Sequence, residues 1–223
     1  MAAIRDRRQN EMKTLDYTLV CDGPSDRSLL RVIEWVISDA LNGKGIGTRG
    51  RFADPRLSAT KLTSLTERVR YGVDQFPCAI LFVHRDAEAS QPAERLGEIS
   101  VAAGACGVDM FVPIVPVRMT EAWLLIDEAA VRRAAGNPNG TVPLDFPKAR
   151  DLEHLHNPKE VLHQVLVLAS EHSGRRLHSF RQRMGMHVHR VAELIGDFRP
   201  LRSLEAFGAF ETATRAALNR VLQ

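Results

Sequence analysis

The chain has 223 residues, of which 30 are Lys or Arg and 27 are Asp or Glu, so its formal net charge is +3. Its 44% hydrophobic and 26% charged residues are typical of a soluble globular protein. No apolar run reaches the roughly 18–20 residues of a membrane-spanning helix, and the polar start lacks the apolar core of a signal peptide, so we expect a cytoplasmic protein without a membrane partner.

The first half of the chain alternates apolar runs with amphipathic stretches. After a polar arm of about twelve residues, apolar runs predict strands at 17–21, 78–83 and 110–117. Apolar residues at helical spacing predict helices at 29–41, at 58–71 with Ser58 as the N-cap, and at 92–105. The glycine-rich stretch 42–50 predicts a flexible connection.

This order of elements predicts how the sheet is built. Strands that are apolar throughout and separated by helices are typical of a parallel sheet covered on both faces. Pro113 and Pro116 lack the N–H that a central strand needs, so the third strand is expected to be short or at an edge. We therefore expect an α/β fold, with a Rossmann-like, mainly parallel sheet and helices on both faces.

From Thr120 onward the strand pattern ends. The stretch 120–135 predicts two helical pieces that meet near Asp127, and a loop rich in Gly, Asn and Pro follows. Asn157 followed by Pro158 is a strong helix start, and further helices are expected up to residue 223. We expect an α/β domain over 1–127 and a C-terminal helical extension over 128–223, packed together as one compact unit.

Carboxylates follow the first two predicted strands at the points where the strands end. Asp22 and Asp26 come after the first strand, and Asp86 and Glu88 come after the second. Ligands of open α/β sheets bind outside the carboxyl ends of the strands, and carboxylates gathered there repel one another unless a cation joins them. Oxygen-only ligands favour Mg²⁺ or Mn²⁺ over zinc. Each acid also has a simpler interpretation, as a helix cap or a solvated turn residue.

Several stretches resemble Toprim proteins. The segment V-C-D-G-P-S-D at 20–26 resembles the first Toprim motif, and A-I-L-F-V-H-R-D-A-E at 79–88 resembles the second, a strand that ends in Asp-x-Asp. The segment V-P-V-R-M-T-E-A-W-L-L-I-D at 115–127 resembles a family of stand-alone Toprim-like proteins of unknown function, and the stretches 157–160 and 202–211 are similar to that family too. Toprim is the catalytic module shared by topoisomerases, bacterial primases and the overcoming-lysogenisation-defect (OLD) nucleases.

The resemblance implies roles for individual residues. Asp22 takes the position of the general acid/base or metal ligand, with Asp26 as the second acid of the first motif. Asp86 and Glu88 take the Mg²⁺-binding positions, and Glu121 is a further acid beside the site. The family normally has Glu at the first position and Asp at the last, so Asp22 is one methylene shorter and Glu88 one longer. We therefore expect Asp22, Asp26 and Glu121 to be catalytic, and Asp22, Asp86 and Glu88 to bind Mg²⁺ or Mn²⁺.

A basic strip at residues 174–190 contains five arginines and no acid. Together with Phe180 it predicts a surface that follows a nucleic-acid backbone, although a merely solvated helix face would have the same composition. The expected nucleic-acid contacts are Arg175, Arg176, Arg181, Arg183 and Arg190. Trp123, beside two leucines, is predicted to be a core residue, and His84 is the histidine closest to the expected site.

These features favour an enzyme, a Mg²⁺-dependent nuclease that hydrolyses phosphodiester bonds of DNA or RNA. The resemblance to OLD nucleases further implies phage defence with a separately encoded ATPase as partner, and a homodimer is also compatible with the sequence. One alternative is a catalytically degenerate Toprim module that binds nucleic acid or a protein partner. A second alternative is a phosphohydrolase or receiver-like domain in which Asp22 or Asp86 accepts a phosphoryl group.

Overall fold

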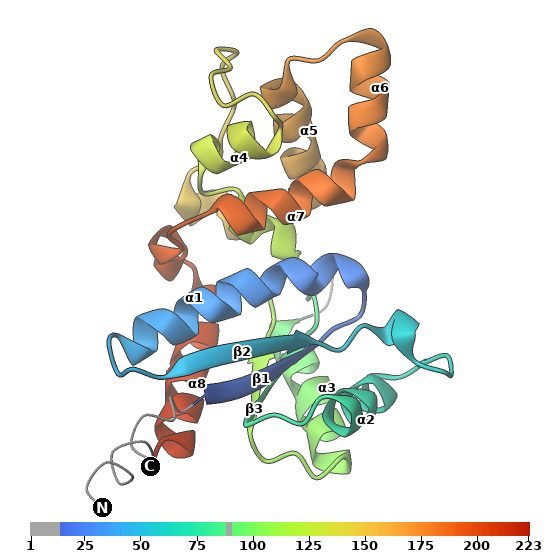
Figure 1. Cartoon of the computed structure of the whole chain (residues 1–223), viewed down its shortest axis with the longest axis vertical. Helices are drawn as coiled ribbons and strands as arrows, with labels where there is room; N and C mark the ends of the chain where they lie inside the picture. Colours follow the sequence, from blue (N-terminus) through green and yellow to red (C-terminus); the bar gives the residue numbers. More distant parts are fainter. Residues whose placement is uncertain (1–13, 88–90) are drawn as a thin grey trace, which may run out of the picture.

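The structure is a computed structural model that describes residues 14–87 and 91–223. Four parallel strands form a sheet in the order β2-β1-β3-β4 (Figure 1). The strands are β1 (Thr14–Val20), β2 (Gly47–Phe52), β3 (Ile80–His84) and β4 (Phe111–Ile114). The predicted α/β class and parallel sheet are confirmed. The predicted N-terminal arm and Glu88 lie outside the described residues.

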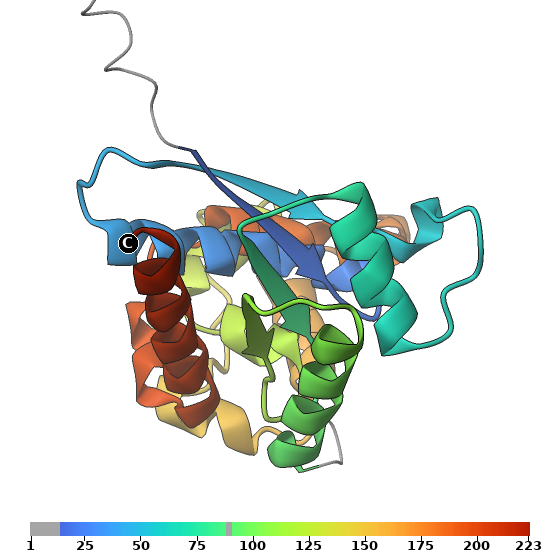
Figure 2. The same ribbon diagram turned by 90° about the horizontal axis from the view of Figure 1, so that it is seen from below.

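Helices cover both faces of the sheet (Figure 2). One face carries α1 (Leu29–Leu41) and α8 (Glu205–Val221), and the other carries α2 (Leu65–Gln75) and α3 (Pro92–Ala105). Leu19 of β1 packs into the first of these cores and its neighbour Val20 into the second, because successive side chains of a strand point to opposite faces. Burial on both faces explains why β3 and the second half of β1 are mostly apolar.

A second group of helices lies beyond α1, in the upper part of Figure 1. It contains the 3₁₀ helix η4 (Thr120–Leu124), α4 (Glu128–Ala134), η5 (Ala149–His154), α5 (Pro158–Ser170), α6 (Gly174–Gln182) and α7 (Met184–Leu194). Asp127 caps α4 by accepting from Ala130 N at 2.9 Å, and Asn157 caps α5 by accepting from Glu160 N at 3.2 Å. After η6 (Arg199–Ser203), the chain returns to the sheet as α8.

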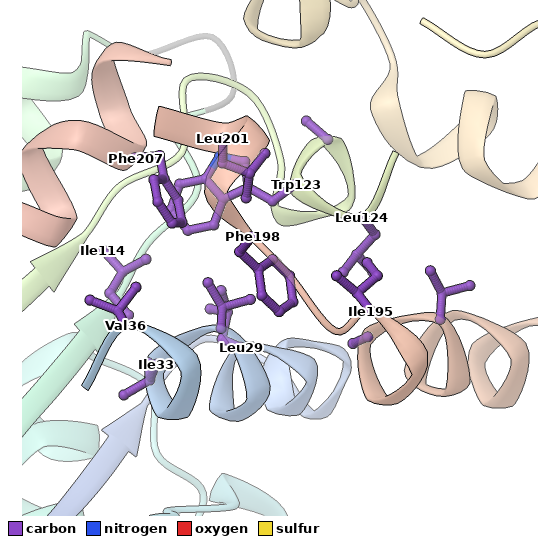
Figure 3. Packing of buried hydrophobic residues seen from close by; sticks show 14 of the residues in the cluster. Leu29, Ile33, Val36, Ile114, Trp123, Leu124, Ile195, Phe198, Leu201 and Phe207 are labelled. Atoms are coloured by element: carbon purple, nitrogen blue, oxygen red, sulfur yellow. The ribbon is translucent and has the colours of Figure 1, made fainter. Parts of the chain in front are cut away.

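A continuous hydrophobic core joins the two groups of elements (Figure 3). Leu29 of α1 lies on the side of the helix that faces Phe198, and Ile33 belongs to the same core. Trp123 is 1% exposed, and its ring centroid lies 5.3 Å from that of Phe207 on α8. The predicted core position of Trp123 is therefore confirmed. In the described part of the chain, no helix is both long and apolar enough to span a bilayer.

The prediction of a flexible connection over 42–50 was wrong at its end, because β2 begins at Gly47. This edge strand has no apolar run, since most of its side chains are partly or fully exposed. Gly50 is required where it stands, since a Cβ there would overlap the ring of Tyr17 on the neighbouring strand. Glycine by itself is typical of a loop, but Gly50 lies in a strand because Tyr17, far away in the sequence, packs over it.

The predicted start of the second helix was also wrong. Ser58 ends the short 3₁₀ turn η3 (Pro55–Leu57), and α2 begins at Leu65. Ser64 and Glu67 form a reciprocal capping box: Glu67 N donates to Ser64 Oγ at 3.2 Å, and Ser64 N donates to Glu67 Oε2 at 3.0 Å. Two satisfied backbone donors make this a stronger start than a lone serine. The short edge strand expected from Pro113 is confirmed by β4.

Candidate functional site

A pocket lies at the carboxyl ends of the adjacent strands β1 and β3, where the parallel topology directs both chain exits to one edge. It is formed by the turn η2 (Pro24–Ser28), the residues after β3 and the first turns of α3. We call it the strand-end pocket. Its lining includes Asp22, Asp26, His84, Arg85, Asp86 and Arg95. The structure thus brings three of the sequence-predicted acids, Asp22, Asp26 and Asp86, to one place.

His84, the last residue of β3, forms the floor of the strand-end pocket and is 1% exposed. Its Nδ1 lies 3.1 Å from the carbonyl oxygen of Ile114, which can only accept, so Nδ1 carries a proton. Burial lowers the pKa of His84, but the carboxylates of Asp86 and Asp26 outweigh it, and the net pKa is raised. Its Nε2 lies 3.4 Å from Asp86 Oδ1 and 4.0 Å from Asp26 Oδ2.

Asp86 is held in place by the segment that follows β4. The backbone N–H of Thr120 donates to Asp86 Oδ1 at 3.2 Å, and the Thr120 hydroxyl lies 3.4 Å from the same oxygen. That hydroxyl also lies 3.2 Å from His84 Nε2, and Thr120 itself is buried. Asp86, His84 and Thr120 therefore form one connected group built from β3 and η4.

Asp26 accepts hydrogen bonds from its own turn and also lines the strand-end pocket. Its Oδ2 accepts from the backbone N–H of Gly23 at 3.2 Å, and its Oδ1 accepts from the Ser25 hydroxyl at 3.0 Å. The simpler interpretation of Asp26 as a local cap is therefore correct for part of its bonding. Its position near His84 adds a second role, because the carboxylate contributes to the raised pKa of that histidine.

Asp22 is bound to two arginines. Arg68 Nη1 of α2 donates to Asp22 Oδ1 at 2.6 Å, and Arg85 Nε lies 3.0 Å from Asp22 Oδ2. Each carboxylate oxygen thus faces a guanidinium group. This environment would disfavour a cation at Asp22, since the arginines already neutralise the charge that would attract it.

Glu121 follows Thr120 on η4, and the other acids of the site influence its pKa. Burial is the largest cause of its raised pKa; Asp86 and Asp26 raise it further, whereas Lys159 at the start of α5 lowers it. The structure therefore places Glu121 in the electrostatic field of Asp86 and Asp26. A carboxyl group with a raised pKa is suited to carrying a proton near neutral pH.

The donor chemistry of the pocket suits a hard cation, but the described residues hold no complete ligand set. Asp26 and Asp86 each place a carboxylate oxygen within 4.0 Å of His84 Nε2, and both add to the raised pKa of Glu121, whose largest cause is burial. A divalent ion would relieve this repulsion. Over 14–87 and 91–223, no group of three His, Cys, Asp or Glu side chains is arranged to hold a metal. The predicted ligand Glu88 is not among these residues.

The five predicted nucleic-acid-binding arginines of the basic strip are all exposed; they lie on α6 and α7, except for Arg183, which joins the two helices. Helix α7 packs against η2, and Asp26 and Arg27 of η2 influence the pKa of His189 on α7, so the strip extends to the edge of the strand-end pocket. The prediction for Phe180 was wrong: its ring is 3% exposed and stacks on His187 with the ring centroids 3.9 Å apart. Phe180 is a core residue and offers no platform to a base.

Sequence reasoning missed the polar partners that organise the acids. Thr120 lies in the segment 115–127, so its place before Glu121 was a usable signal. Arg85 stands between His84 and Asp86 in the sequence, which places it at the strand end. Arg68 has no local signal, because α2 brings it to Asp22 across 46 residues.

Comparisons with known protein families, with curated proteins and with solved structures found no match for this chain. The resemblance to Toprim proteins therefore depends on the motif residues alone. What the protein does has to be argued from the strand-end pocket.

Proposed function

We propose that the chain is a nuclease dependent on Mg²⁺ or Mn²⁺, which hydrolyses phosphodiester bonds of DNA or RNA in the strand-end pocket. One observation carries the proposal: Asp26 and Asp86 each place a carboxylate oxygen near His84 Nε2, at 4.0 and 3.4 Å, at the carboxyl ends of two adjacent parallel strands. In open α/β sheets this edge is where ligands bind. Arginines line the same pocket, so it offers groups for both a cation and a phosphate.

The residues of the site have different proposed roles in catalysis. Asp86 and Asp26 would hold the cation, with Thr120 and His84 fixing the orientation of Asp86. When bound, Mg²⁺ or Mn²⁺ polarises the phosphate and lowers the pKa of a coordinated water. Glu121 does not line the pocket, but its pKa is raised, chiefly by burial, so it can take up or release a proton near this pair of acids.

Cleavage assays with matched variants test this proposal. Plasmid, linear DNA and RNA are incubated with Mg²⁺ or Mn²⁺ and with the wild type or the variants Asp86→Asn, Asp26→Asn and Asp22→Ala. We expect Asp86→Asn and Asp26→Asn each to lower the rate by about 10²-fold or more, because the cation loses a ligand or its geometry. We also expect Asp22→Ala to lower the rate, since Arg85 loses its anchor in the pocket.

The matched control is Asp109→Asn, which removes an exposed carboxylate just before β4, at the opposite edge of the sheet. This variant should cleave like the wild type. Circular dichroism spectra establish that every variant is folded. Metal-dependent cleavage that survives Asp86→Asn and Asp26→Asn would assign the activity to another site and reject the proposal.

A second candidate function is a non-catalytic module that binds nucleic acid or a protein partner. The pairing of Asp22 with two arginines favours it, since a carboxylate neutralised in this way is a poor metal ligand. This candidate predicts nucleic-acid binding by the wild type without cleavage in any metal. An ATPase partner and a role in phage defence remain proposals that depend only on the resemblance to OLD nucleases.

A further inference from the structure

A chain of alternating ion pairs adjoins the strand-end pocket. Arg68 pairs with Asp22 at 2.6 Å, and Asp22 pairs with Arg85 at 3.0 Å. Arg85 Nη1 then lies 3.0 Å from Glu98 Oε2, and Glu98 in turn pairs with Arg95 at 3.0 Å. Three guanidinium groups thus share two carboxylates, and two of the three, those of Arg85 and Arg95, line the pocket.

The arginines of this chain of ion pairs have hydrogen-bond donors without partners. Arg95 directs Nη1 at both oxygens of Glu98, while its Nε is buried and has no hydrogen-bond partner among the described residues. The Nε atoms of Arg68 and Arg85 also lack a well-aligned acceptor there. Buried donors without partners are costly, so an acceptor that reached one of them after a small movement of the side chain would be stabilised.

The composition of the pocket identifies the kind of acceptor. Arg85 and Arg95 line the strand-end pocket together with Asp26 and Asp86. Carboxylates and arginines in one pocket suit a ligand that carries negative charge and also contacts a cation. Phosphate fits this description. Arginine binds phosphate oxygens with two parallel N–H donors, and its guanidinium group is weakly hydrated, so removing water from it costs little free energy.

We propose that Arg85 and Arg95 form an anion site that docks a phosphate group of the substrate beside Asp26 and Asp86. This inference deepens the proposed function and rests on it for the identity of the substrate, whereas the phosphate binding itself does not require catalysis. Glu98 pairs with both guanidinium groups, and Asp22 is a second partner of Arg85, so these carboxylates hold the two arginines in position.

Metal-free binding measurements test the anion site separately from cleavage. The full chain in EDTA is titrated with inorganic phosphate and, in a second arm, with a dinucleotide that contains one internal phosphodiester. Binding is followed by calorimetry and by the rise in Tm. We expect Arg95→Gln to weaken binding about tenfold or more, as expected for loss of a charged hydrogen-bond donor. Arg95→Lys, which keeps the charge without the planar fork, should give an intermediate loss.

Two further variants make the result specific. Arg70→Gln changes an exposed arginine of α2 outside the strand-end pocket and should bind like the wild type. Asp86→Asn removes a negative charge from the same pocket and should bind at least as tightly, even though it is expected to lower the cleavage rate about 10²-fold or more. A rise in Tm that is equal in the wild type and Arg95→Gln, or absent in both, would overturn the anion site whatever the cleavage assays show.

Discussion

Arg202 holds two carboxylates from different helices. Its guanidinium group lies 2.6 Å from Glu211 of α8 and 2.5 Å from Asp39 of α1, and Arg215 binds the same two acids at 2.8 and 2.6 Å. Arg202 also lies over the ring of Trp35, 5.2 Å from its centroid. The hydrogen bond from Arg202 is the largest cause of the lowered pKa of Glu211. These residues connect the two helices that cover one face of the sheet.

Replacing Arg202 should therefore destabilise the fold in a pH-dependent way. We expect Arg202→Ala to lower the free energy of unfolding by about 1–2 kcal/mol at pH 7, a value reduced because the guanidinium group is partly exposed and screened. Since the folded-state pKa of Glu211 is lowered, this contribution is present above the ordinary glutamate pKa and is lost as the pH falls through the folded-state value. Urea unfolding at pH 7 and at successively lower pH should show the gap from the wild type closing.

Arg199→Ala is the matched control, because among the described residues the Arg199 side chain pairs with the partly exposed Asp197 alone, two residues away in the sequence. It should leave the unfolding midpoint almost unchanged at pH 7. A gap between the wild type and Arg202→Ala that stays constant down to strongly acidic pH would contradict the assignment of the stability to these carboxylates.

The residues of the candidate site differ in how far the sequence could place them. Asp26 and Asp86 could be placed near each other, because parallel strands end at a common edge and the apolar runs marked those ends. The arginine partners of Asp22 could not all be placed in the same way. Arg68 reaches Asp22 only through the packing of α2, and that depends on contacts between residues far apart in the sequence.

At the scale of elements, the close approach of α2 to β1 depends on a glycine. Gly72 lies on the buried side of α2, where an added Cβ would come within 2.5 Å of Val20 Cγ2. The spacing of apolar residues predicted a helix here, but it could not indicate how close that helix comes to the sheet. The edge strand β2 was not predicted for a related reason. Its Gly50 lies under the ring of Tyr17 on the neighbouring strand β1, a contact between residues far apart in the sequence.

Alanine substitutions at two helical glycines should act in opposite directions. We expect Gly72→Ala to destabilise the protein by about 1–3 kcal/mol, because the extra methyl group forces α2 away from Val20. Gly97→Ala in α3, where nothing lies within 4 Å of an added Cβ, should stabilise it by up to about 1 kcal/mol, since alanine favours the helix. Urea unfolding of both variants measures the difference. Equal stabilisation by the two substitutions would refute the close contact between α2 and β1.

At the scale of the whole molecule, opposite charges are separated in space. The strand-end pocket gathers acids at the edge of the sheet, while the basic strip at 174–190 carries its exposed arginines along α6 and α7. Contact of α7 with η2 places one end of the strip beside the pocket. A polyanion that follows the strip would therefore be guided toward the proposed catalytic groups.

Nucleic-acid binding should depend steeply on salt. We expect the triple variant Arg175→Ala, Arg176→Ala, Arg181→Ala to bind duplex DNA more weakly. The magnitude of the slope of log affinity against log salt should fall by about 2–3, because fewer phosphate contacts release fewer counterions on binding. Fluorescence anisotropy at several salt concentrations measures the slope. Arg220→Ala, which changes an exposed arginine near the end of α8, is the control and should keep the wild-type slope. Binding that does not respond to salt would rule out the basic strip as the contact surface.

The return of α8 to the sheet has a consequence for the order in which the protein is made. Phe207 and Phe210 of α8 complete the core over β4 and Trp123, yet all of α4, α5, α6 and α7 are synthesised between β4 and α8. During translation the strands therefore leave the ribosome well before one of the helices that covers them. Until α8 emerges, that face of the nascent sheet keeps apolar side chains open to solvent, which makes this interval the period when a chaperone would have most to protect.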